Sequence, residues 1–372
     1  MQTGMTSIHK YFQDITDPRV TNRSSHLFIE ILAIALIATL AGAENFNDIE
    51  LFAKNKEVWF GTFLTLPGGI PSHDTFNRVF SLILPEEFSK CFIAWTKSLA
   101  QKIEGVVAID GKTLRSSFDS ASQTSALHMV SAWSAENELV LGQIRTAAKS
   151  NEITAIPQLI AMLDLEGATV TIDAMGCQKG IAQSILNAGA DYILALKGNQ
   201  GNTLGNVKSI WEEIEKNVSH RAFYTQYETT DKDHGRIETR KVYSINVTGM
   251  EEFKEWPGLK SVTKIVSSRE IIGQGTTEET RYYLSSLQAD AKKIGLAVRS
   301  HWGIENSLHW ILDVNFREDH ARNRKDHSAE NMAILRHMAL NLIKKERSTK
   351  TSFRGKRHKA SWSDDYLLSF LS

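Results

Sequence analysis

The stretch GVVAIDGKT, residues 105–113, decides the fold, because a β-branched and apolar run leads there into an acid, Asp110. The arrangement recurs in ATVTIDAMG, residues 168–176, where a second such run leads into Asp173. Short, continuously apolar runs are typical of parallel strands that are buried on both faces. Functional groups gather beyond the carboxyl ends of such strands. We therefore expect Asp110 and Asp173 to lie together at one edge of a sheet.

The periodicity around these two runs changes from helical to strand-like at Val106. Asn137 favours a turn between the second and third strands, whereas the later strands need helical crossovers because they run parallel. We expect strands at 106–110, 127–134 and 139–145, a helix at 153–163, a strand at 169–173, a helix at 178–188 and a strand at 192–196. Three strands followed by alternating helices and strands is the RNase H-like order, so the predicted fold class is α/β with an RNase H-like catalytic domain.

The remaining segments are predicted as additions to this domain. A helix that follows Pro71 and is capped by Ser72 suits either a DNA-reading helix or an ordinary packing helix, and both interpretations stay open. Asp290 is expected to cap a later helix. The predicted domains are an N-terminal all-helical, DNA-binding or packing domain at 1–104, the first part of the catalytic core at 105–222, a β-rich insertion at 223–289, the closing helices of the core at 290–346 and a basic C-terminal tail at 347–372.

Composition limits the classes of protein that the chain can belong to. The 43 Lys and Arg residues equal the 43 Asp and Glu residues, so any surface that binds nucleic acid must be local. Cys91 and Cys177 are far apart in sequence, which favours neither a disulfide framework nor a structural zinc site. The apolar run at 27–43 contains Glu30 and is shorter than the roughly 20 residues that span a bilayer. A cytoplasmic protein without a membrane segment is expected.

A third acid, Glu305, lies in RSHWGIENSLHW, residues 299–310, on a predicted helix whose face is otherwise apolar and aromatic. Either aspartate alone is explained as the start of a turn, since Asp110 precedes Gly111 and Asp173 precedes a small residue. Three such acids together favour function. Carboxylates are the ligands that hard divalent ions prefer, and two such ions support phosphodiester cleavage. The three acids therefore predict a metal-dependent nuclease.

Several motifs carry a resemblance that covers nearly the whole chain: AIDGKTLR, TIDAMGCQKGIA, DYILALKGNQ, HGRIETR and VRSHWGIENSLHWILDVNFRED. The chain resembles the DDE transposases of bacterial insertion sequences, in the group that contains the H-repeat-associated proteins. The resemblance implies that Asp110, Asp173 and Glu305 bind Mg²⁺ or Mn²⁺. It also implies cleavage at transposon ends, joining of the 3′-hydroxyl to target DNA, and a homo-oligomer on paired terminal inverted repeats at the bacterial nucleoid.

The residues around Glu305 depart from the pattern of better-studied relatives. Those relatives carry a Tyr, an Arg and a Lys at set offsets, with the Arg one helical turn before the glutamate. Here that turn holds His301, the nearest arginine is Arg299, and the seventh residue after Glu305 is Leu312. Asp313 is thereby left as a weaker candidate for the third acid.

Basic residues near the predicted site are candidates for contacts to DNA phosphates. In HGRIETR, the polar residues His234, Arg236, Glu238 and Arg240 alternate along one strand face, which suits either a DNA backbone or cross-strand ion pairs. Residues 315–360 are strongly basic, as are residues 347–359. The predicted DNA contacts are Lys112, Lys179, Lys197, Arg236, Arg240, Arg299, His301, Arg317, Arg322 and Arg324.

The leading functional prediction is a transposase, a Mg²⁺-dependent endonuclease and strand transferase. Two other classes stay open: a DNA-binding protein that has lost catalysis, and an RNase H-like nuclease without strand transfer. Intact acids at all three positions argue against the first of these alternatives.

Overall fold

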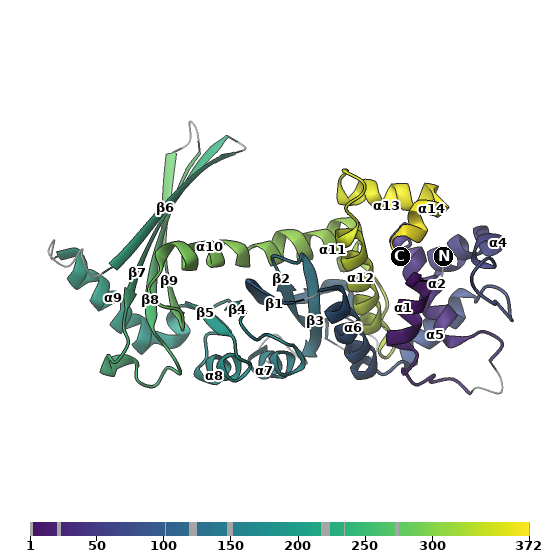
Figure 1. Ribbon diagram of the computed structural model, residues 1–372, viewed down its shortest axis with the longest axis horizontal. Helices are drawn as coiled ribbons and strands as arrows, with labels where there is room; N and C mark the ends of the chain where they lie inside the picture. Colours follow the sequence, from purple (N-terminus) through teal and green to yellow (C-terminus); the bar gives the residue numbers. More distant parts are fainter. Residues whose placement is uncertain are drawn as a thin grey trace.

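A single mixed sheet runs through one part of an elongated molecule, and a bundle of helices forms the other part (Figure 1). The computed structural model describes the chain except for residues 1–2, 21–23, 101, 119–124, 147–151, 217–223, 234, 272–274 and 372. In this described part, nine strands follow the order β3-β2-β1-β4-β5-β9-β8-β7-β6. The strands are β1 Val106–Leu114, β2 Leu127–Ser134, β3 Leu139–Thr146, β4 Thr169–Ile172, β5 Asp191–Leu196, β6 Tyr224–Asp233, β7 Arg236–Asn246, β8 Ser261–Ile271 and β9 Gly275–Ser285.

Strands β1 to β5 confirm the predicted RNase H-like order. β1 pairs antiparallel with β2, and β2 antiparallel with β3, whereas β1, β4 and β5 are parallel neighbours. Helices α7 (Glu152–Met162) and α8 (Lys179–Asn187) cover one face, and α10 (Ala291–His301) crosses the other (Figure 1). Because successive side chains of a strand alternate between faces, Val107 and Ile109 pack on the α7 side, while Ala108 packs on the opposite side.

The segment predicted as a β-rich insertion extends the same sheet. Strand β9 pairs antiparallel with β5, from Ile193 opposite Ser285 to Leu196 opposite Tyr282, and β8, β7 and β6 follow outward. Helix α9 (Gly201–Lys216) precedes these strands. The sequence analysis named no strand at β6, because YTQYETTDKD is almost wholly polar and lacks the apolar face that marks a half-buried strand.

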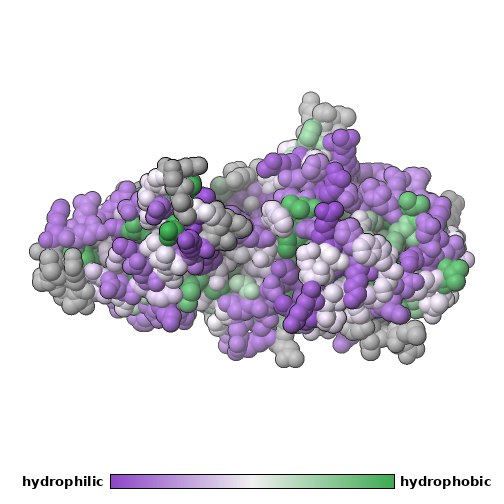
Figure 2. Space-filling view, turned by 90° about the horizontal axis from the view of Figure 1, so that it is seen from above, coloured by the Kyte–Doolittle hydropathy of each residue, from purple (hydrophilic) through white to green (hydrophobic). Residues whose placement is uncertain are grey.

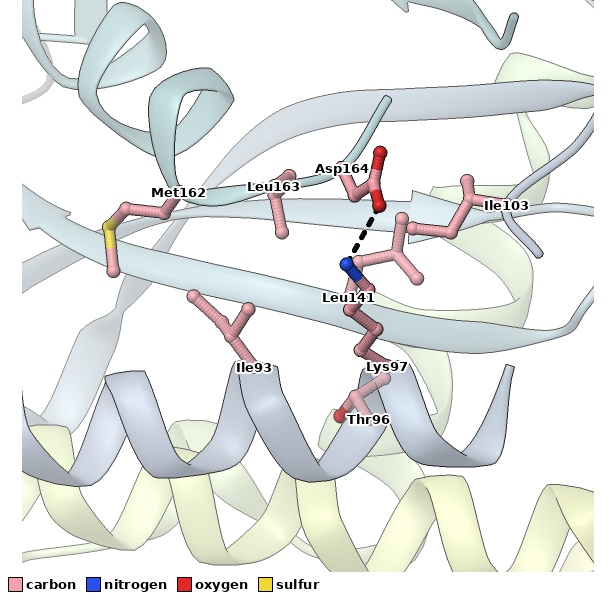
Figure 3. A pocket seen from close by; sticks show the side chains of 8 residues that line it. All are labelled: Ile93, Thr96, Lys97, Ile103, Leu141, Met162, Leu163 and Asp164. Carbon is pink, nitrogen blue, oxygen red and sulfur yellow. Dashed lines mark hydrogen bonds and ion pairs between the residues drawn. The ribbon is translucent and has the colours of Figure 1, made fainter. Parts of the chain in front are cut away.

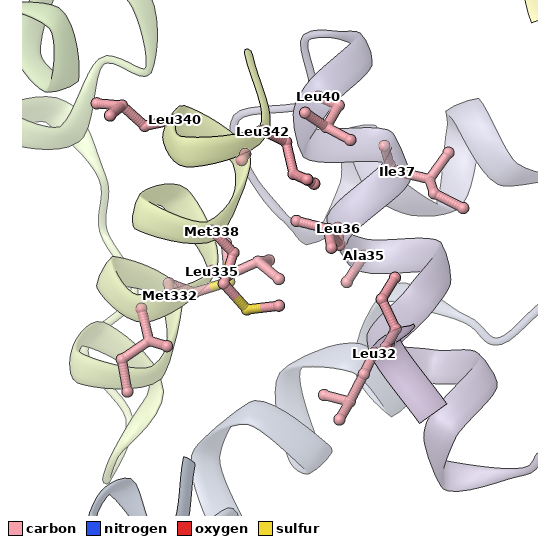
Figure 4. Packing of buried hydrophobic residues seen from close by; sticks show 14 of the residues in the cluster. Leu32, Ala35, Leu36, Ile37, Leu40, Met332, Leu335, Met338, Leu340 and Leu342 are labelled. Atoms are coloured by element: carbon pink, nitrogen blue, oxygen red, sulfur yellow. The ribbon is translucent and has the colours of Figure 1, made fainter. Parts of the chain in front are cut away.

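Helices from both ends of the chain share one hydrophobic core. Helix α2 is buried along residues 30–40, so it needs neighbours on every side. Figure 4 shows Leu335 and Met338 of α12 pointing toward Leu36 of α2. The helices of this bundle are α1 Thr3–Phe12, α2 Phe28–Ala41, α3 Phe46–Asn55, α4 Glu57–Phe60, α5 His73–Leu82, α6 Pro85–Leu99, α12 Ser328–Lys345, α13 Phe353–Trp362 and α14 Asp364–Ser369.

The structure differs from the sequence-based prediction in two places: the domain boundaries at 104 and 346, and the basic C-terminal tail at 347–372. The boundaries at 104 and 346 do not separate hydrophobic cores, since residues 8–95 and 304–371 contribute to the same cluster. The segment expected as a basic tail folds into α13 and α14, where Tyr366, Leu367 and Phe370 are buried. These apolar residues follow Asp365, the last charged residue of the chain, and so lie outside the basic run at 347–359 on which the prediction rested.

Helix α5 begins as predicted, with the Ser72 hydroxyl accepting a hydrogen bond of 3.3 Å from the Thr75 amide. Phe76, Val79 and Phe80 are buried in the shared core. No single helix in the described ranges is long and apolar enough to cross a membrane; α2 and α3 reach that composition only as a pair that is bent by 93°.

Candidate active site

Asp110 of β1 and Asp173, which directly follows β4, are neighbours where the parallel pairing of these two strands ends. The parallel register of β1 and β4 places Ile109 opposite Ile172, and each aspartate is the next residue along its strand. The side chain of Asp110 is 21% exposed. Asp173 is more exposed, and its Oδ1 accepts hydrogen bonds from the amides of Met175 at 3.0 Å and Gly176 at 3.3 Å. Asp173 therefore begins a turn and also presents a carboxylate to solvent.

Glu305 is carried across this edge by a long, interrupted helix. Asp290 caps α10 by accepting a hydrogen bond of 2.9 Å from the Lys293 amide, as predicted. A wide π-helical turn at Glu305–His309 and helix α11 (Trp310–Asn315) follow α10. Such turns are frequent at functional sites. Ile304 and Leu308 are fully buried, whereas the Glu305 side chain is exposed, so the helix packs against the protein while Glu305 stays open to solvent.

The carboxylates act on one another electrostatically. Burial, against a hydrogen bond from the Gly111 amide and together with the charges of Asp173, Glu152 and Glu305, raises the pKa of the Asp110 carboxyl to about 7. A bound cation would relieve this repulsion. The oxygen donors of Asp110, Asp173 and Glu305 suit Mg²⁺ or Mn²⁺. In the conformation described, no three His, Cys, Asp or Glu side chains of the described residues already converge as a formed metal site.

Two histidines flank Glu305 at a spacing of four residues on each side. Nδ1 of His301 lies 2.9 Å from the Thr171 hydroxyl, and burial lowers the pKa of His301. Nδ1 of His309 lies 3.6 Å from Oδ2 of Asp110, and burial lowers the pKa of His309 to about 3. His301, predicted to contact DNA, is thus held against β4. His309 was not among the predicted site residues, although the spacing His-x₃-Glu-x₃-His was visible in the sequence.

Lys112 and Asp313 are paired with each other. Nζ of Lys112 lies 2.5 Å from Oδ1 of Asp313 and 2.8 Å from Oε2 of the buried Glu318. Two carboxylates therefore neutralise Lys112, which was predicted to contact DNA. Asp313 is engaged by this lysine, and the charge of Glu305, rather than that of Asp313, is among the main influences on Asp110. Asp313 is thus occupied by Lys112, whereas the side chain of Glu305 is exposed.

A buried polar pair supports β1 beneath Asp110. Nε2 of His128 lies 2.5 Å from Oε1 of Glu152, and Nδ1 of His128 lies 2.8 Å from the Thr113 hydroxyl. The pair packs on Gly111 so closely that a Cβ at this position would lie 2.3 Å from the Glu152 carboxylate. Only glycine fits there. This pair is not predicted from the sequence, because its two members come from separate segments, β2 and α7.

Most of the other predicted DNA contacts have protein partners. Arg236 and Arg240 pair with Glu238, and Arg240 also lies 3.0 Å from Asp231 on β6; His234 lies outside the described residues. Lys197 and Arg322 are exposed. The remaining contacts are Lys179 with Glu255, Arg299 with Asp231 at 4.0 Å, Arg317 with Glu44 at 3.7 Å, and Arg324 with the Ser116 carbonyl at 3.1 Å.

Two cavities lie outside the acidic cluster. The first, of about 340 Å³, is lined mainly by apolar side chains, and Figure 3 shows Lys97 of α6 reaching toward Asp164 across it, with the two charged groups 2.8 Å apart. The second, of about 470 Å³, is polar and lined in part by Asn199 and Gln200. Asn199 donates a hydrogen bond of 2.7 Å to the Ala174 carbonyl, which ties this cavity to the turn of Asp173.

The face that carries α10 and α11 is predominantly hydrophilic, with hydrophobic residues in small separate spots (Figure 2). Trp302 and Trp310 are exposed on this helix, and the guanidinium of Arg281 lies 5.1 Å from the Trp302 ring. The site is thus open to solvent on this side.

Comparisons with known proteins identify the family of this chain. Residues 101–342 match the family model described as "Transposase DDE domain", and residues 9–96 match the model described as "DDE_Tnp_1-associated". The chain is 39% identical to the "H repeat-associated putative transposase YhhI" of Escherichia coli strain K12, over 99% of this chain and 98% of that protein. It is 41% identical to the "Putative transposase YncI" of Escherichia coli O157:H7, over 99% and 95%.

A comparison with solved structures finds the piggyBac transposase in a synaptic complex with hairpin DNA. The TM-score is 0.42 at 10% identity, covering 99% of this chain and 77% of that chain.

Proposed function

The chain belongs to the DDE transposase family, and we propose that it uses Asp110, Asp173 and Glu305 to hold divalent ions, Mg²⁺ or Mn²⁺, for DNA cleavage. The observation that carries this proposal is the parallel register of β1 and β4, which brings two carboxylates to one sheet edge beneath the Glu305 helix. The mutual effect of the acidic charges on the pKa of Asp110 supports it. The turn role of Asp173 does not compete, since that side chain keeps an exposed carboxylate.

The residues of the site have separable tasks in this proposal. Divalent ions held by Asp110, Asp173 and Glu305 would supply an activated water or hydroxyl and would neutralise charge on the leaving oxygen. Asp110, on a strand buried at its base, fixes the position of the cluster. Asp173 and Glu305, which are exposed, close it from the neighbouring strand and from the helix. The helix face beyond Glu305 is open, which admits a duplex.

We further propose that the substrate is double-stranded DNA of the terminal inverted repeats, with transfer of the 3′-hydroxyl to target DNA by a homo-oligomer in the bacterial cytoplasm. Lys197 is the strongest candidate for a phosphate contact, because it is exposed and lies two residues before Asn199, which bonds to the Ala174 carbonyl after Asp173. Arg322 follows, since it is exposed in the loop after Glu318. The cations that already have protein partners are weaker candidates.

The test is cleavage of a duplex that carries the inverted repeats flanking the reading frame, with purified full-length protein and Mg²⁺. We expect Asp110→Asn to lower cleavage by roughly 100-fold or more, because losing a metal ligand removes several kcal/mol of charge stabilisation. Asp164→Asn is the matched control, since Asp164 is an exposed acid just after α7 that pairs with Lys97. Equal cleavage by wild type and Asp110→Asn would contradict the proposal.

A second measurement separates the alternatives. A duplex with a pre-cut 3′ end is incubated with a target plasmid, and joined product is expected. Cleavage without joining would identify a nuclease, and end-specific binding without cleavage would identify a DNA-binding protein that has lost catalysis.

A further inference from the structure

His309 has a contact that ordinary hydrogen bonding does not explain. Its Nδ1 lies 3.6 Å from Oδ2 of Asp110, whereas an N–H···O hydrogen bond spans about 2.7–3.2 Å. Its other ring nitrogen, Nε2, is buried without a hydrogen-bond partner in the described part of the chain. Buried polar atoms nearly always have a partner. The imidazole is therefore placed for an interaction that these protein groups alone do not provide.

We propose that His309 is a ligand of the divalent ion held by Asp110, so that the site has a nitrogen donor beside its carboxylates. This inference rests on the proposed function. Two ligand atoms that each lie about 2.1 Å from one ion are about 3 Å apart at right angles and about 4 Å apart on opposite sides. The observed separation of 3.6 Å lies between these limits.

His309 and Glu305 lie on the same side of their helix. The two residues are the first and last of the π-helical turn, where a turn takes more than four residues, so both lie on the same side of the helix. The buried side chains of Ile304 and Leu308 hold the helix in this rotation. Residues four apart also share one face of an ordinary α-helix, so the spacing of Glu305 and His309 by itself places both on this side.

The surroundings of His309 also resemble those of a metal-binding histidine. Such a histidine usually donates its second ring N–H to a carboxylate. Glu318 is available for this role: its Oε1 is buried without a hydrogen-bond partner among the described residues, and its charge acts on His309. Lys112 holds the other oxygen of Glu318 at 2.8 Å. Oε1 of Glu318 also lies 3.8 Å from Nη1 of the buried Arg336. His309 Nε2 and Glu318 Oε1 thus both lack hydrogen bonds among the described residues, while Glu318 keeps ion pairs to Lys112 and Arg336.

A nitrogen ligand changes which metal the site prefers. Carboxylates suit Mg²⁺ and Mn²⁺, whereas imidazole suits ions such as Zn²⁺ and Ni²⁺. We therefore expect the wild-type protein to bind Zn²⁺ more tightly than Mg²⁺. Loss of the imidazole should reduce that difference, because it removes the donor that Mg²⁺ uses poorly.

The test is pulsed electron paramagnetic resonance of the full-length protein loaded with Mn²⁺, which detects a coordinated imidazole through its ¹⁴N coupling. Wild type should show this coupling, and His309→Asn should lose it and bind Mn²⁺ at least about 10-fold more weakly. His320→Asn is the matched control, since His320 is an exposed histidine in the next turn of the chain, and it should behave as wild type.

A second variant guards against loss of folding in the first. His309→Cys replaces the nitrogen by a thiolate, which prefers soft metals, so the variant should gain Cd²⁺ binding with a sulfur-to-metal absorption band. Mn²⁺ bound by wild type without ¹⁴N coupling, or coupling retained in His309→Asn, would overturn this inference and leave the proposed function intact. Equal Mn²⁺ binding by wild type and Asp110→Asn would overturn both.

Discussion

The nine-stranded sheet has an inner half, β1 to β5, and an outer half, β6 to β9, and the two halves differ in how their side chains are stabilised. Strand β2 of the inner half is buried along its whole length, whereas the first six residues of β9 in the outer half are exposed. Helices cover both faces of the inner half, while β6 to β9 extend beyond α10 (Figure 1). The inner half is held by apolar packing, and the ends of the outer strands by backbone pairing and ion pairs.

This difference explains where the candidate site lies. Apolar packing on both faces fixes the register of β1 and β4, and with it the relative position of Asp110 and Asp173. In the outer half, Arg240 is matched to Asp231 and Glu238, and Arg281 to Glu279. Opposite charges in the outer half thus neutralise one another, whereas the carboxylates of Asp110, Asp173 and Glu305 in the inner half repel one another.

The largest expected effect comes from glycines in the two regions. Gly111→Ala forces a Cβ to within 2.3 Å of the Glu152 carboxylate, so it should cost about 3 kcal/mol or more through overpacking and disruption of the buried pair with His128. Gly205→Ala, on the exposed side of α9, meets no atom within 4 Å and should stabilise by about 0.5–1 kcal/mol. Urea unfolding measures both. Equal urea midpoints for Gly111→Ala and Gly205→Ala would contradict the expected difference in packing between the two positions.

A somewhat smaller effect is expected at the edge strand β3. Asn341 of α12 accepts a hydrogen bond of 2.8 Å from the Val140 amide and donates one of 2.9 Å to its carbonyl. Asn341→Ala leaves both groups buried, so we expect a loss of about 2–4 kcal/mol in the free energy of unfolding. Thr230→Ala removes an exposed cross-strand contact to Thr239 and should cost less than about 1 kcal/mol. A similar cost for both would show that burial does not decide the difference.

The third expected effect depends on pH. Burial raises the pKa of Glu330 from its ordinary value to about 7, although Arg145 of β3 lies 3.9 Å away. A raised carboxyl pKa favours folding at low pH, and this contribution is lost as the pH rises from about 4.5 through 7. Glu330→Gln should therefore be more stable than wild type at pH 8, by on the order of 1–3 kcal/mol, and similar at pH 4. Thermal unfolding across this range measures the change.

Glu270→Gln is the control in the outer half. Its side chain is exposed near the end of β8, so the substitution should leave the pH profile of stability unchanged. If Glu330→Gln follows wild type at every pH, the ion pair with Arg145 outweighs burial.

The smallest effect is expected for DNA binding by the outer half. Because Arg240 is paired within the hairpin, Arg240→Gln should leave the slope of log K against log salt unchanged. Lys197→Gln, at an exposed cation, should reduce the slope by about 1. Binding to a labelled duplex at several salt concentrations measures this, and the reverse result would place the DNA on the outer strands.

Sequence reasoning located features with local signals and missed those that depend on distant segments. The strands of Asp110 and Asp173 were found because each is a continuous apolar run, and the Ser72 and Asp290 caps because each precedes a periodic helix. Strand β6 has no apolar face to reveal it. The pair of His128 and Glu152 forms only when β2 and α7 meet, so neither residue stands out alone.

The hydrophobic core that helices from both ends of the chain share could not be predicted from the sequence either. The apolar character of α2 shows that it is buried, yet the sequence does not say which segment covers it. The structure shows that α12 and α13 do, from the other end of the chain.

That joining of the two ends has a consequence for synthesis. The first six helices leave the ribosome well before α12 to α14 exist, so the apolar sides of α2 lack part of their cover until translation is complete. A nascent or prematurely terminated chain would expose this surface and attract chaperones or proteases. The cell would thereby accumulate full-length protein and few folded fragments, even though the acids Asp110, Asp173 and Glu305 are all made before the closing helices.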